Sequence, residues 1–284
     1  MKHIDGIASL APVYDGFILD LWGVIHDGVN PYPGARDCLV ALRAAQKRIV
    51  LLSNAPRRAT PVRAQLQRMG IGEELYDGVM TSGEASHVLL RDRPDQRSRA
   101  LGRRVFHLGP KRDENVLAGL DLELVDSPAS ATFLLNTGPD DHANPTDPAA
   151  FDSILQACAA ANLPMICANP DLEVIRGGVR VVCAGTLAAR YADMNGGPVL
   201  NVGKPDPLIY APVLEMLGLP HAKILAVGDA LRTDIAGARA IGVDACWVLG
   251  GLHGEHLAGN HAAIEAEAAG AGLAPVAAVP AFIW

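Results

Sequence analysis

Four polar residues of this sequence each follow a short apolar run, and their side chains suit the transfer of a phosphoryl group. Asp20 ends "GFILD", Ser53 ends "RIVLLS", Lys204 follows "VLNVG" and Asp229 follows "KILAVG". If these runs are parallel strands, their carboxyl ends are where ligands bind, so we expect the four side chains to meet at one sheet edge. Taken singly, each residue also suits a helix cap, a turn or a solvated surface. Together the four favour a catalytic site.

The chemistry that fits these residues is phosphoryl transfer through a covalent intermediate. Asp20 would attack phosphorus, and Ser53 and Lys204 would hold the transferring group. A divalent metal bridging Asp20 and Asp229 would neutralise the phosphate oxygens, and Mg2+ suits such carboxylate ligands. Asp234 follows Asp229 in the same segment, where it could orient a metal-bound water. The alternative for Asp234 is an acid that simply favours a helix N-terminus.

The segments around these residues predict an α/β fold. Short runs rich in Val, Ile and Leu alternate with amphipathic segments of helical length, which is typical of a parallel sheet flanked by helices. Residues 33–48 predict a helix that begins at Pro33 and Gly34, and residues 60–70 predict a helix with Thr60 as its N-cap and Gly70 as its stop. We expect strands at 16–21, 48–52, 78–81, 104–108, 131–135, 164–167, 199–202, 223–228 and 243–248.

Two segments are candidate domain boundaries. Residues 91–99, "RDRPDQRSR", are charged and contain a proline, so we expect an exposed connection there. The second candidate is "MNGGPV", residues 194–199. A chain of 284 residues exceeds the usual size of a single domain, so one large or two medium domains are expected.

Composition indicates a globular protein with neither a nucleic-acid nor a membrane partner. Of the residues, 50% are hydrophobic and 19% charged, and the net charge is -7 without any basic block suited to a polyanion. The five cysteines lack a metal-binding pattern, which favours buried thiols in a reducing compartment. No run is long enough for a membrane span, and the first residues lack a signal-peptide core. We therefore predict a cytoplasmic protein.

Four segments resemble, in order, the four motifs of haloacid dehalogenase (HAD) superfamily hydrolases: "ILDLWGV", "LLSNAPR", "NVGKPDP" and "VGDALRTDIAGA". "VMTSGEAS", "CANPDLEV" and "CAGTLAARY" further resemble the type IIA branch, which includes 4-nitrophenyl, nucleotide, sugar and pyridoxal phosphatases. The resemblance implies a Rossmann-like HAD core with helices on both faces of its sheet, formed by residues 1–83 and 198–284. It also implies a large α/β cap domain inserted at residues 84–197.

The resemblance assigns the main catalytic roles to the residues already singled out. It implies that Asp20 is the nucleophile, Asp229 a metal ligand, Ser53 a phosphate donor and Lys204 the clamp. It also implies that the backbone carbonyl of Trp22 is a metal ligand, which any side chain permits.

Two asparagines match family positions near the substrate, Asn54 and Asn169, and the resemblance places Asn169 on the cap. For Asn169 and Asp171 the alternative is an "NPD" turn, in which both side chains bond to their own backbone.

Trp22 departs from the family pattern, which has an aspartate two residues after the nucleophile. That aspartate serves as general acid and then as general base, and one such group contributes about 100- to 10,000-fold. We therefore expect hydrolysis to be weakened rather than abolished. His26 is one candidate replacement. The indole of Trp22 could stack on a substrate ring or close the pocket, and we favour closure because a large aromatic side chain more often packs.

The leading hypothesis is a magnesium-dependent phosphatase-like hydrolase that acts on a small phosphorylated metabolite through an aspartyl-phosphate intermediate. The alternative is a catalytically impaired relative that binds a phosphorylated ligand in a regulatory role. A phosphotransferase or a dehalogenase ranks below both. The retained nucleophile, clamp and acids favour the enzyme, whereas Trp22 favours the alternative. The sequence does not name the substrate, and it leaves open whether the chain forms a homo-oligomer.

Overall fold

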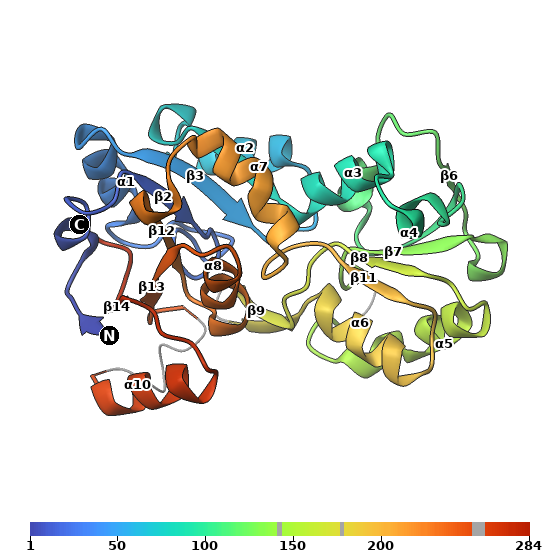
Figure 1. The fold of residues 1–284 in the computed structure, drawn as a ribbon. Coiled ribbons are helices and arrows are strands. Elements are labelled where there is room, and N and C mark those ends of the chain that lie inside the picture. Colours follow the sequence, from blue (N-terminus) through green and yellow to red (C-terminus); the bar gives the residue numbers. More distant parts are fainter. Residues whose placement is uncertain (141–143, 177–178, 252–258) are drawn as a thin grey trace.

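The larger of two parallel sheets contains the strands that precede most of the predicted site residues (Figure 1). The computed structural model describes residues 1–140, 144–176, 179–251 and 259–284. All neighbouring strands of the larger sheet are parallel, in the order β1-β14-β13-β12-β2-β3-β4. These strands are β1 Lys2–His3, β2 Gly16–Leu19, β3 Arg48–Ser53, β4 Gly78–Thr81, β12 Ile224–Gly228, β13 Asp244–Val248 and β14 Ala277–Val279.

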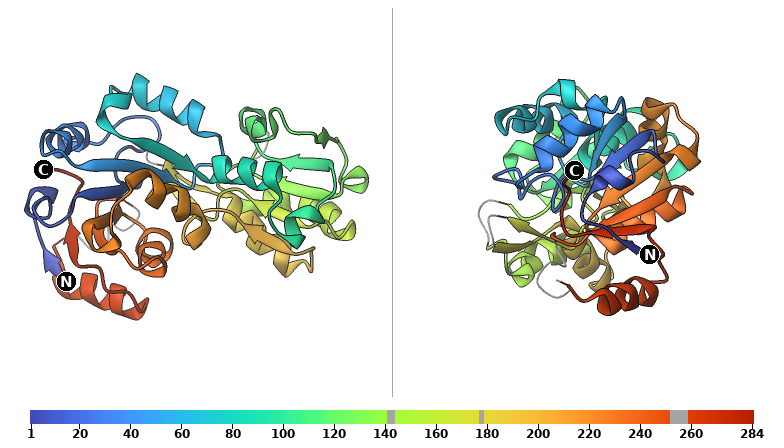
Figure 2. Two further views of the ribbon diagram at one scale, coloured as in Figure 1. Left: turned by 45° about the horizontal axis from the view of Figure 1, so that its top comes forward. Right: turned by 90° about the vertical axis from the view of Figure 1, so that its left-hand side faces the viewer.

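The smaller parallel sheet has the strand order β11-β8-β7-β5-β6. Its strands are β5 Arg104–Leu108, β6 Glu123–Leu124, β7 Phe133–Asn136, β8 Met165–Cys167 and β11 Val199–Asn201. An antiparallel hairpin is formed by β9 Glu173–Arg176 and β10 Val179–Val182. Figure 1 shows the larger sheet and both chain ends on the left and the smaller sheet on the right, and the views in Figure 2 show the same division.

Helices cover both faces of the larger sheet, which explains why its strands read as continuous apolar runs. Along β2, Phe17 and Leu19 enter one hydrophobic core, whereas Ile18 enters the other. Leu66 of α2 packs in the first core and Val213 of α7 in the second. The expected α/β class, a Rossmann-like parallel sheet with helices on both faces, is confirmed.

The helices connect successive strands. The α-helices are α1 Ala35–Ala44, α2 Ala59–Arg68, α3 Ser82–Asp92, α4 Gln96–Arg99, α5 Asp152–Ala160, α6 Ala184–Asp193, α7 Pro207–Leu217, α8 Ala236–Ala240 and α10 His261–Gly270. Short 3-10 helices are η1 Ile7–Ser9, η2 Glu73–Leu75, η3 Lys111–Leu117, η4 Pro128–Ser130, η5 Pro148–Phe151 and η6 His221–Lys223, and η7 Leu231–Ile235 is a turn of π-helix.

All nine predicted strands are present, as β2, β3, β4, β5, β7, β8, β11, β12 and β13. The sequence did not predict β1, β6, β14 or the hairpin β9–β10. Four of these strands contain a charged residue or histidine, and β14 is Ala-Ala-Val, so none is a run rich in Val, Ile and Leu without a charge.

The prediction that Thr60 caps the second helix is wrong, because α2 begins at Ala59. The Glu84 carboxylate accepts a hydrogen bond from Ala59 N at 3.0 Å and also pairs with Arg58. A residue of α3 therefore satisfies the first turn of α2, so no N-cap side chain is needed. Gly70 does follow the helix as predicted, with a positive φ of 76°.

The segment 91–99 is largely exposed as predicted, but it is not an irregular connection. Helix α3 continues to Asp92, and α4 begins at Gln96. Asp95 and Ser98 form a reciprocal capping box, with Ser98 N donating to Asp95 Oδ1 at 2.8 Å. This local capping stabilises a short helix that the high charge had concealed.

All five cysteines are free and buried, as the composition predicted. Among the described residues, no helix combines the length and the apolar character needed to cross a membrane.

Candidate active site

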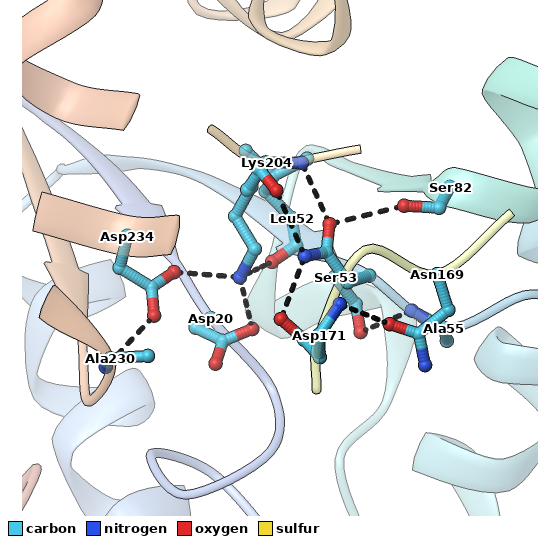
Figure 3. Close-up of polar contacts among 11 residues, drawn as sticks. Asp20, Leu52, Ser53, Ala55, Ser82, Asn169, Asp171, Lys204, Ala230 and Asp234 are labelled. Carbon is cyan, nitrogen blue, oxygen red and sulfur yellow. Dashed lines mark hydrogen bonds and ion pairs between the residues drawn. The ribbon is translucent and has the colours of Figure 1, made fainter. Parts of the chain in front are cut away.

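A buried lysine lies at the centre of the site (Figure 3). Lys204 Nζ donates to Asp20 Oδ1 at 2.7 Å, to Asp234 Oδ1 at 2.6 Å and to the carbonyl of Leu52 at 3.4 Å. Lys204, Asp20 and Asp234 are 3%, 8% and 5% exposed, so these are buried ion pairs. An ammonium group has three donors, and all three have partners here. The site is therefore a fixed arrangement of charges.

Three adjacent strands of the larger sheet bring most of the predicted residues together. Asp20 follows β2, Ser53 ends β3 and Asp229 follows β12, and β2 pairs with both β3 and β12. The carboxyl ends of these parallel strands form one edge, as expected. The strand before Lys204 is different. It is β11, which pairs with β8 of the smaller sheet, so the prediction that all four residues end strands of one sheet is wrong for Lys204.

Asn54 holds Lys204 in the site although their strands belong to different sheets. Asn54 Oδ1 accepts from Lys204 N at 2.8 Å, and Asn54 Nδ2 donates to the Lys204 carbonyl at 3.2 Å. The preceding Gly203 has φ 146°, and a Cβ there would lie 2.6 Å from Asn54 Oδ1 and 2.3 Å from Ser82 Oγ. Only glycine permits this close approach of the backbone.

The environment of Lys204 keeps it charged. Burial by itself would lower the pKa of Lys204, but the charges of Asp20 and Asp234 raise it well above its ordinary value. The ammonium therefore remains available to hold a carboxylate or a phosphate oxygen.

Asp20, Asp229 and Asp234 form a buried cluster with carboxylate oxygens within 4.8 Å of one another. The Asp229 carboxylate lies between two glycines, since a Cβ on either Gly23 or Gly251 would be 2.0 Å from Asp229 Oδ2. Among the described side chains, the three carboxylates of the cluster, when ionised, outnumber the single Lys204 ammonium by two. Burial raises the pKa of Asp20 well above its ordinary value, and against the opposing charge of Lys204 the charges of Asp234 and Asp229 raise it further. A bound cation would favour the ionised carboxylates. Hard oxygen donors with this charge fit a divalent cation such as Mg2+.

Asp234 lies in the first turn of η7, as the helix-terminus alternative expected, and it also pairs with Lys204. Its Oδ2 accepts from Ala230 N at 3.1 Å, immediately before η7, while its Oδ1 accepts from Lys204. Both oxygens thus have protein partners. This arrangement suits a residue that lies behind the metal ligands.

Two hollows meet at the site. A small cavity of about 30 Å³ is lined by the three acids and Lys204. A cleft of about 700 Å³ is lined by Ser53, Asn54 and Asn169, among others. Trp22 and Asp20 line both spaces. Trp22 therefore stands at the junction between the acidic cavity and the open cleft.

The indole of Trp22 is part of the packing at this junction. A Cβ on Gly28 would lie 2.0 Å from Trp22 Cη2, so the ring lies directly over the Gly28 backbone. The ring also contacts His26 edge-on, with centroids 5.5 Å apart. This agrees with the interpretation that Trp22 closes part of the pocket.

His26 is poorly placed to replace the missing acid. It is 2% exposed, and its Nδ1 accepts from Gly28 N at 2.9 Å. Burial, with the charge of Arg57 acting in the same direction, lowers the pKa of His26 to about 4. The ring is therefore neutral near pH 7, and it lines neither hollow.

The "NPD" turn is present, and it reaches the catalytic centre. Asn169 Oδ1 accepts from Asp171 N at 3.0 Å, which is the local turn considered as the alternative. Asp171 Oδ1 in turn accepts from Asn54 Nδ2 at 2.9 Å, and Arg232 donates to the Pro170 carbonyl. Asp171 lines both hollows. Local sequence patterns do not reveal this contact, because Asn54 and Asp171 are 117 positions apart.

Ser53 lies where a phosphate donor is expected, but its hydroxyl also has a local partner. Ser53 Oγ accepts from Ala55 N at 3.1 Å, and the side chain lines the larger cleft beside Asp20. The hydroxyl hydrogen remains free to serve as a donor, because this contact uses only the oxygen.

Comparison with known proteins identifies the family. Residues 17–123 match the family of haloacid dehalogenase-like hydrolases, and residues 201–272 match a second, HAD-hydrolase-like family. Chronophin of Homo sapiens is 31% identical over 248 residues, which cover 84% of this chain and 81% of that protein. The chain belongs to the haloacid dehalogenase-like hydrolase family.

Solved structures agree with this assignment. A haloacid dehalogenase-like hydrolase from Brucella suis 1330 has a TM-score of 0.83 at 33% identity and covers 99% of this chain and 100% of its own. Glycerol phosphate phosphatase from Mycobacterium tuberculosis, in complex with magnesium, has a TM-score of 0.63 at 26% identity and covers 89% of this chain and 71% of its own. The expected type IIA assignment is confirmed, and the chain is a phosphatase-type hydrolase.

Proposed function

We propose that this protein hydrolyses the phosphoric monoester of a small metabolite in a magnesium-dependent reaction with an aspartyl-phosphate intermediate. The observation that carries the proposal is the buried contact of Lys204 with both Asp20 and Asp234 beside Asp229. Burying these charges is costly unless they are paired. Their position at the carboxyl ends of the strands is where parallel sheets bind ligands.

The proposed reaction has two displacements at phosphorus. A carboxylate oxygen of Asp20 attacks phosphorus, the bond from phosphorus to the ester oxygen breaks, and the ester oxygen leaves and takes up a proton from solvent to form the alcohol. Water then attacks the aspartyl-phosphate, loses a proton, releases inorganic phosphate and regenerates the Asp20 carboxylate. Lys204 orients Asp20 and attracts the phosphate, while the Ser53 hydroxyl donates a hydrogen bond to it.

Asp20, Asp229 and the backbone carbonyl of Trp22 are the residues that would hold Mg2+ directly. Asp234 would act from behind them, because Lys204 and Ala230 N already use its oxygens. Bound Mg2+ would stabilise the negative charge on the phosphate oxygens. The excess negative charge of the cluster supports this choice, as does the magnesium complex of the mycobacterial relative.

We propose that Asn54 and Asn169 help to position the substrate and the groups that bind it. The Asn54 amide already bonds to Lys204, Ser82 and Asp171. Asn54 would therefore keep the clamp lysine in place, whereas Asn169 lines the cleft.

Trp22 leaves both proton transfers without the usual aspartate, and His26 is buried and neutral. An ester oxygen that leaves as a stable anion does not need a proton. We therefore propose that aryl phosphates are hydrolysed faster than alkyl phosphates.

We also propose that residues 84–197 act as a cap over a core of residues 1–83 and 198–284. The separate smaller sheet and the contacts of Asp171 and Pro170 with the core support this. Strand β11 pairs with the smaller sheet although it follows residue 197. Five free thiols support the proposal that the protein acts in the reducing cytoplasm.

The test is phosphate release from p-nitrophenyl phosphate, with magnesium or with EDTA. Asp20→Asn should reduce the rate on the order of 10,000-fold or more, since it removes the nucleophile. Asp229→Asn should raise the magnesium concentration needed for half-maximal rate. Asp193→Asn, an exposed change at the end of α6, is the matched control. Release that is insensitive to EDTA and to Asp20→Asn would refute the proposal.

A further inference from the structure

The large cleft beside Asp20 is lined by four arginines that the proposed chemistry does not use. They are Arg57 after β3, Arg68 at the end of α2, Arg112 in η3 and Arg176 at the end of β9. The cleft volume of about 700 Å³ is in the range of small-molecule sites. It extends well beyond the space that a phosphoryl group at Asp20 would occupy.

The arginines are close enough to affect one another. The pKa of Arg57 is lowered, first by burial and then, against the opposing effect of Asp113, by the charges of Arg112, Arg176 and Arg68. Like charges in a partly desolvated cleft repel, and a bound anion relieves that repulsion. In the described part of the chain, the guanidinium groups of Arg57, Arg68 and Arg176 form no ion pair within 4.0 Å and no hydrogen bond, although the charge of Asp113 acts on Arg57.

Acidic residues away from the catalytic end compensate this charge only in part. Asp113 and Asp140 line the same cleft. The cleft as a whole is lined by four arginines and four aspartates; with Asp20 and Asp171 set aside, the arginines outnumber Asp113 and Asp140 by two. The other two carboxylates of the cleft, Asp20 and Asp171, lie at the catalytic end, near Lys204. A local excess of arginines is notable in a chain whose net charge is -7.

We propose that these arginines bind a second anionic group, a phosphate or a carboxylate, of the same small substrate whose ester phosphate lies against Asp20. The inference rests on the proposed phosphatase function. The planar guanidinium group matches phosphate and carboxylate oxygens in pairs. Met69, Val174 and Val181 also line the cleft, so they would contact the carbon skeleton between the two anions.

Binding is measured by calorimetry on full-length Asp20→Asn protein with magnesium, because this variant holds a substrate without turnover. Fructose 1,6-bisphosphate is compared with fructose 6-phosphate, and 3-phosphoglycerate with glycerol 3-phosphate. The first pair tests a second phosphate and the second pair a carboxylate. At least one doubly anionic probe should bind about 10- to 100-fold more tightly than its partner, the scale of hydrogen bonds between charged groups.

Arg57→Gln and Arg176→Gln in the same background should each lower that ratio about 10-fold. Arg104→Gln removes an equal charge from the exposed start of β5 and should leave the ratio unchanged. Thermal melting identifies a variant that fails to fold, in which case the other arginine variant is decisive.

Equal affinity within both probe pairs, absence of binding by every probe, or a ratio unaffected by both arginine variants overturns the inference. The proposed function fails separately, by absence of magnesium-dependent release from p-nitrophenyl phosphate, which carries no second anion.

Discussion

The small cavity lined by acids and the large cleft lined by arginines share Trp22 and Asp20 in their walls. They differ in whether their charged side chains are buried and paired with one another. In the cavity, adjacent strands place buried acids around Lys204, and every donor of that lysine has a protein partner. In the cleft, arginines from four separate segments outnumber the aspartates beside them once Asp20 and Asp171 are assigned to the catalytic end, and Arg68, Arg112 and Arg176 are exposed. Fixed, buried charges suit a reaction centre. Arginines gathered from distant segments around an open cleft suit the recognition of an anionic ligand.

Among the changes that test this comparison, the largest effect is expected from replacing the residue at the junction. Trp22→Asp would add an acid to the cavity and should raise the rate on alkyl phosphates about 100- to 10,000-fold. Aryl phosphates should gain less, because their leaving group needs no proton. Release from glycerol 3-phosphate and from p-nitrophenyl phosphate measures the difference.

Trp22→Asn is the matched control for that experiment, because it opens the same space over Gly28 without supplying an acid. Circular dichroism and thermal melting report any disorder caused by loss of the indole. If a well-folded Trp22→Asp protein gains no more than Trp22→Asn on alkyl phosphates, residue 22 does not limit proton transfer.

A pH-dependent loss of stability is expected on the cleft side. His107 contacts Thr137 Oγ1 at 2.8 Å, and Thr137 lines the cleft. Burial lowers the pKa of His107 to about 4, against about 6.5 in an unfolded chain. As pH falls from 6.5 to 4, the unfolded chain takes up a proton that the folded protein does not. His107 thus contributes stability above pH 6.5 that is lost towards pH 4, by about 3 kcal/mol.

Urea unfolding at several pH values measures this loss. His107→Gln should make the free energy of unfolding less dependent on pH between 6.5 and 4. An unchanged dependence in the variant would show that His107 is not the group that couples stability to pH.

The smallest effect is expected at Asp171, which lines both hollows. Asp171→Asn removes the charge that accepts a hydrogen bond from Asn54 Nδ2. Hydrogen bonds to charged groups contribute more than neutral ones, so kcat/KM for p-nitrophenyl phosphate should fall about 10-fold. Asp193→Asn again serves as the control. Unchanged kinetics in Asp171→Asn would mean that this contact does not support the position of Asn54 and Lys204.

Much of the larger sheet and of the acidic cavity could be predicted from sequence. Strands buried on both faces are continuous apolar runs, and β2, β3 and β12 each lead directly to a polar residue. Asp20, Ser53 and Asp229 could therefore be found and placed on one edge. Their nearness follows from neighbouring parallel strands, so it needed no knowledge of side-chain packing.

Contacts between distant segments could not be predicted in this way. Thr60 has the properties of an N-cap, but Glu84 from the next helix satisfies the start of α2. Arg57 and Arg176 lie more than a hundred positions apart, and nothing in either local sequence indicates that both line one cleft.

The sequence by itself determined the α/β class, the sheet edge where Asp20, Ser53 and Asp229 lie, and the absence of an acid at residue 22. Each of these follows from local patterns: apolar runs, strand ends and the identity of one side chain. Only the tertiary structure decided that Lys204 arrives from the smaller sheet, that Asp171 joins Asn54, and that the arginines share a cleft. The reason is physical, since pairing between strands and the electrostatic balance of a cleft depend on which distant segments pack together.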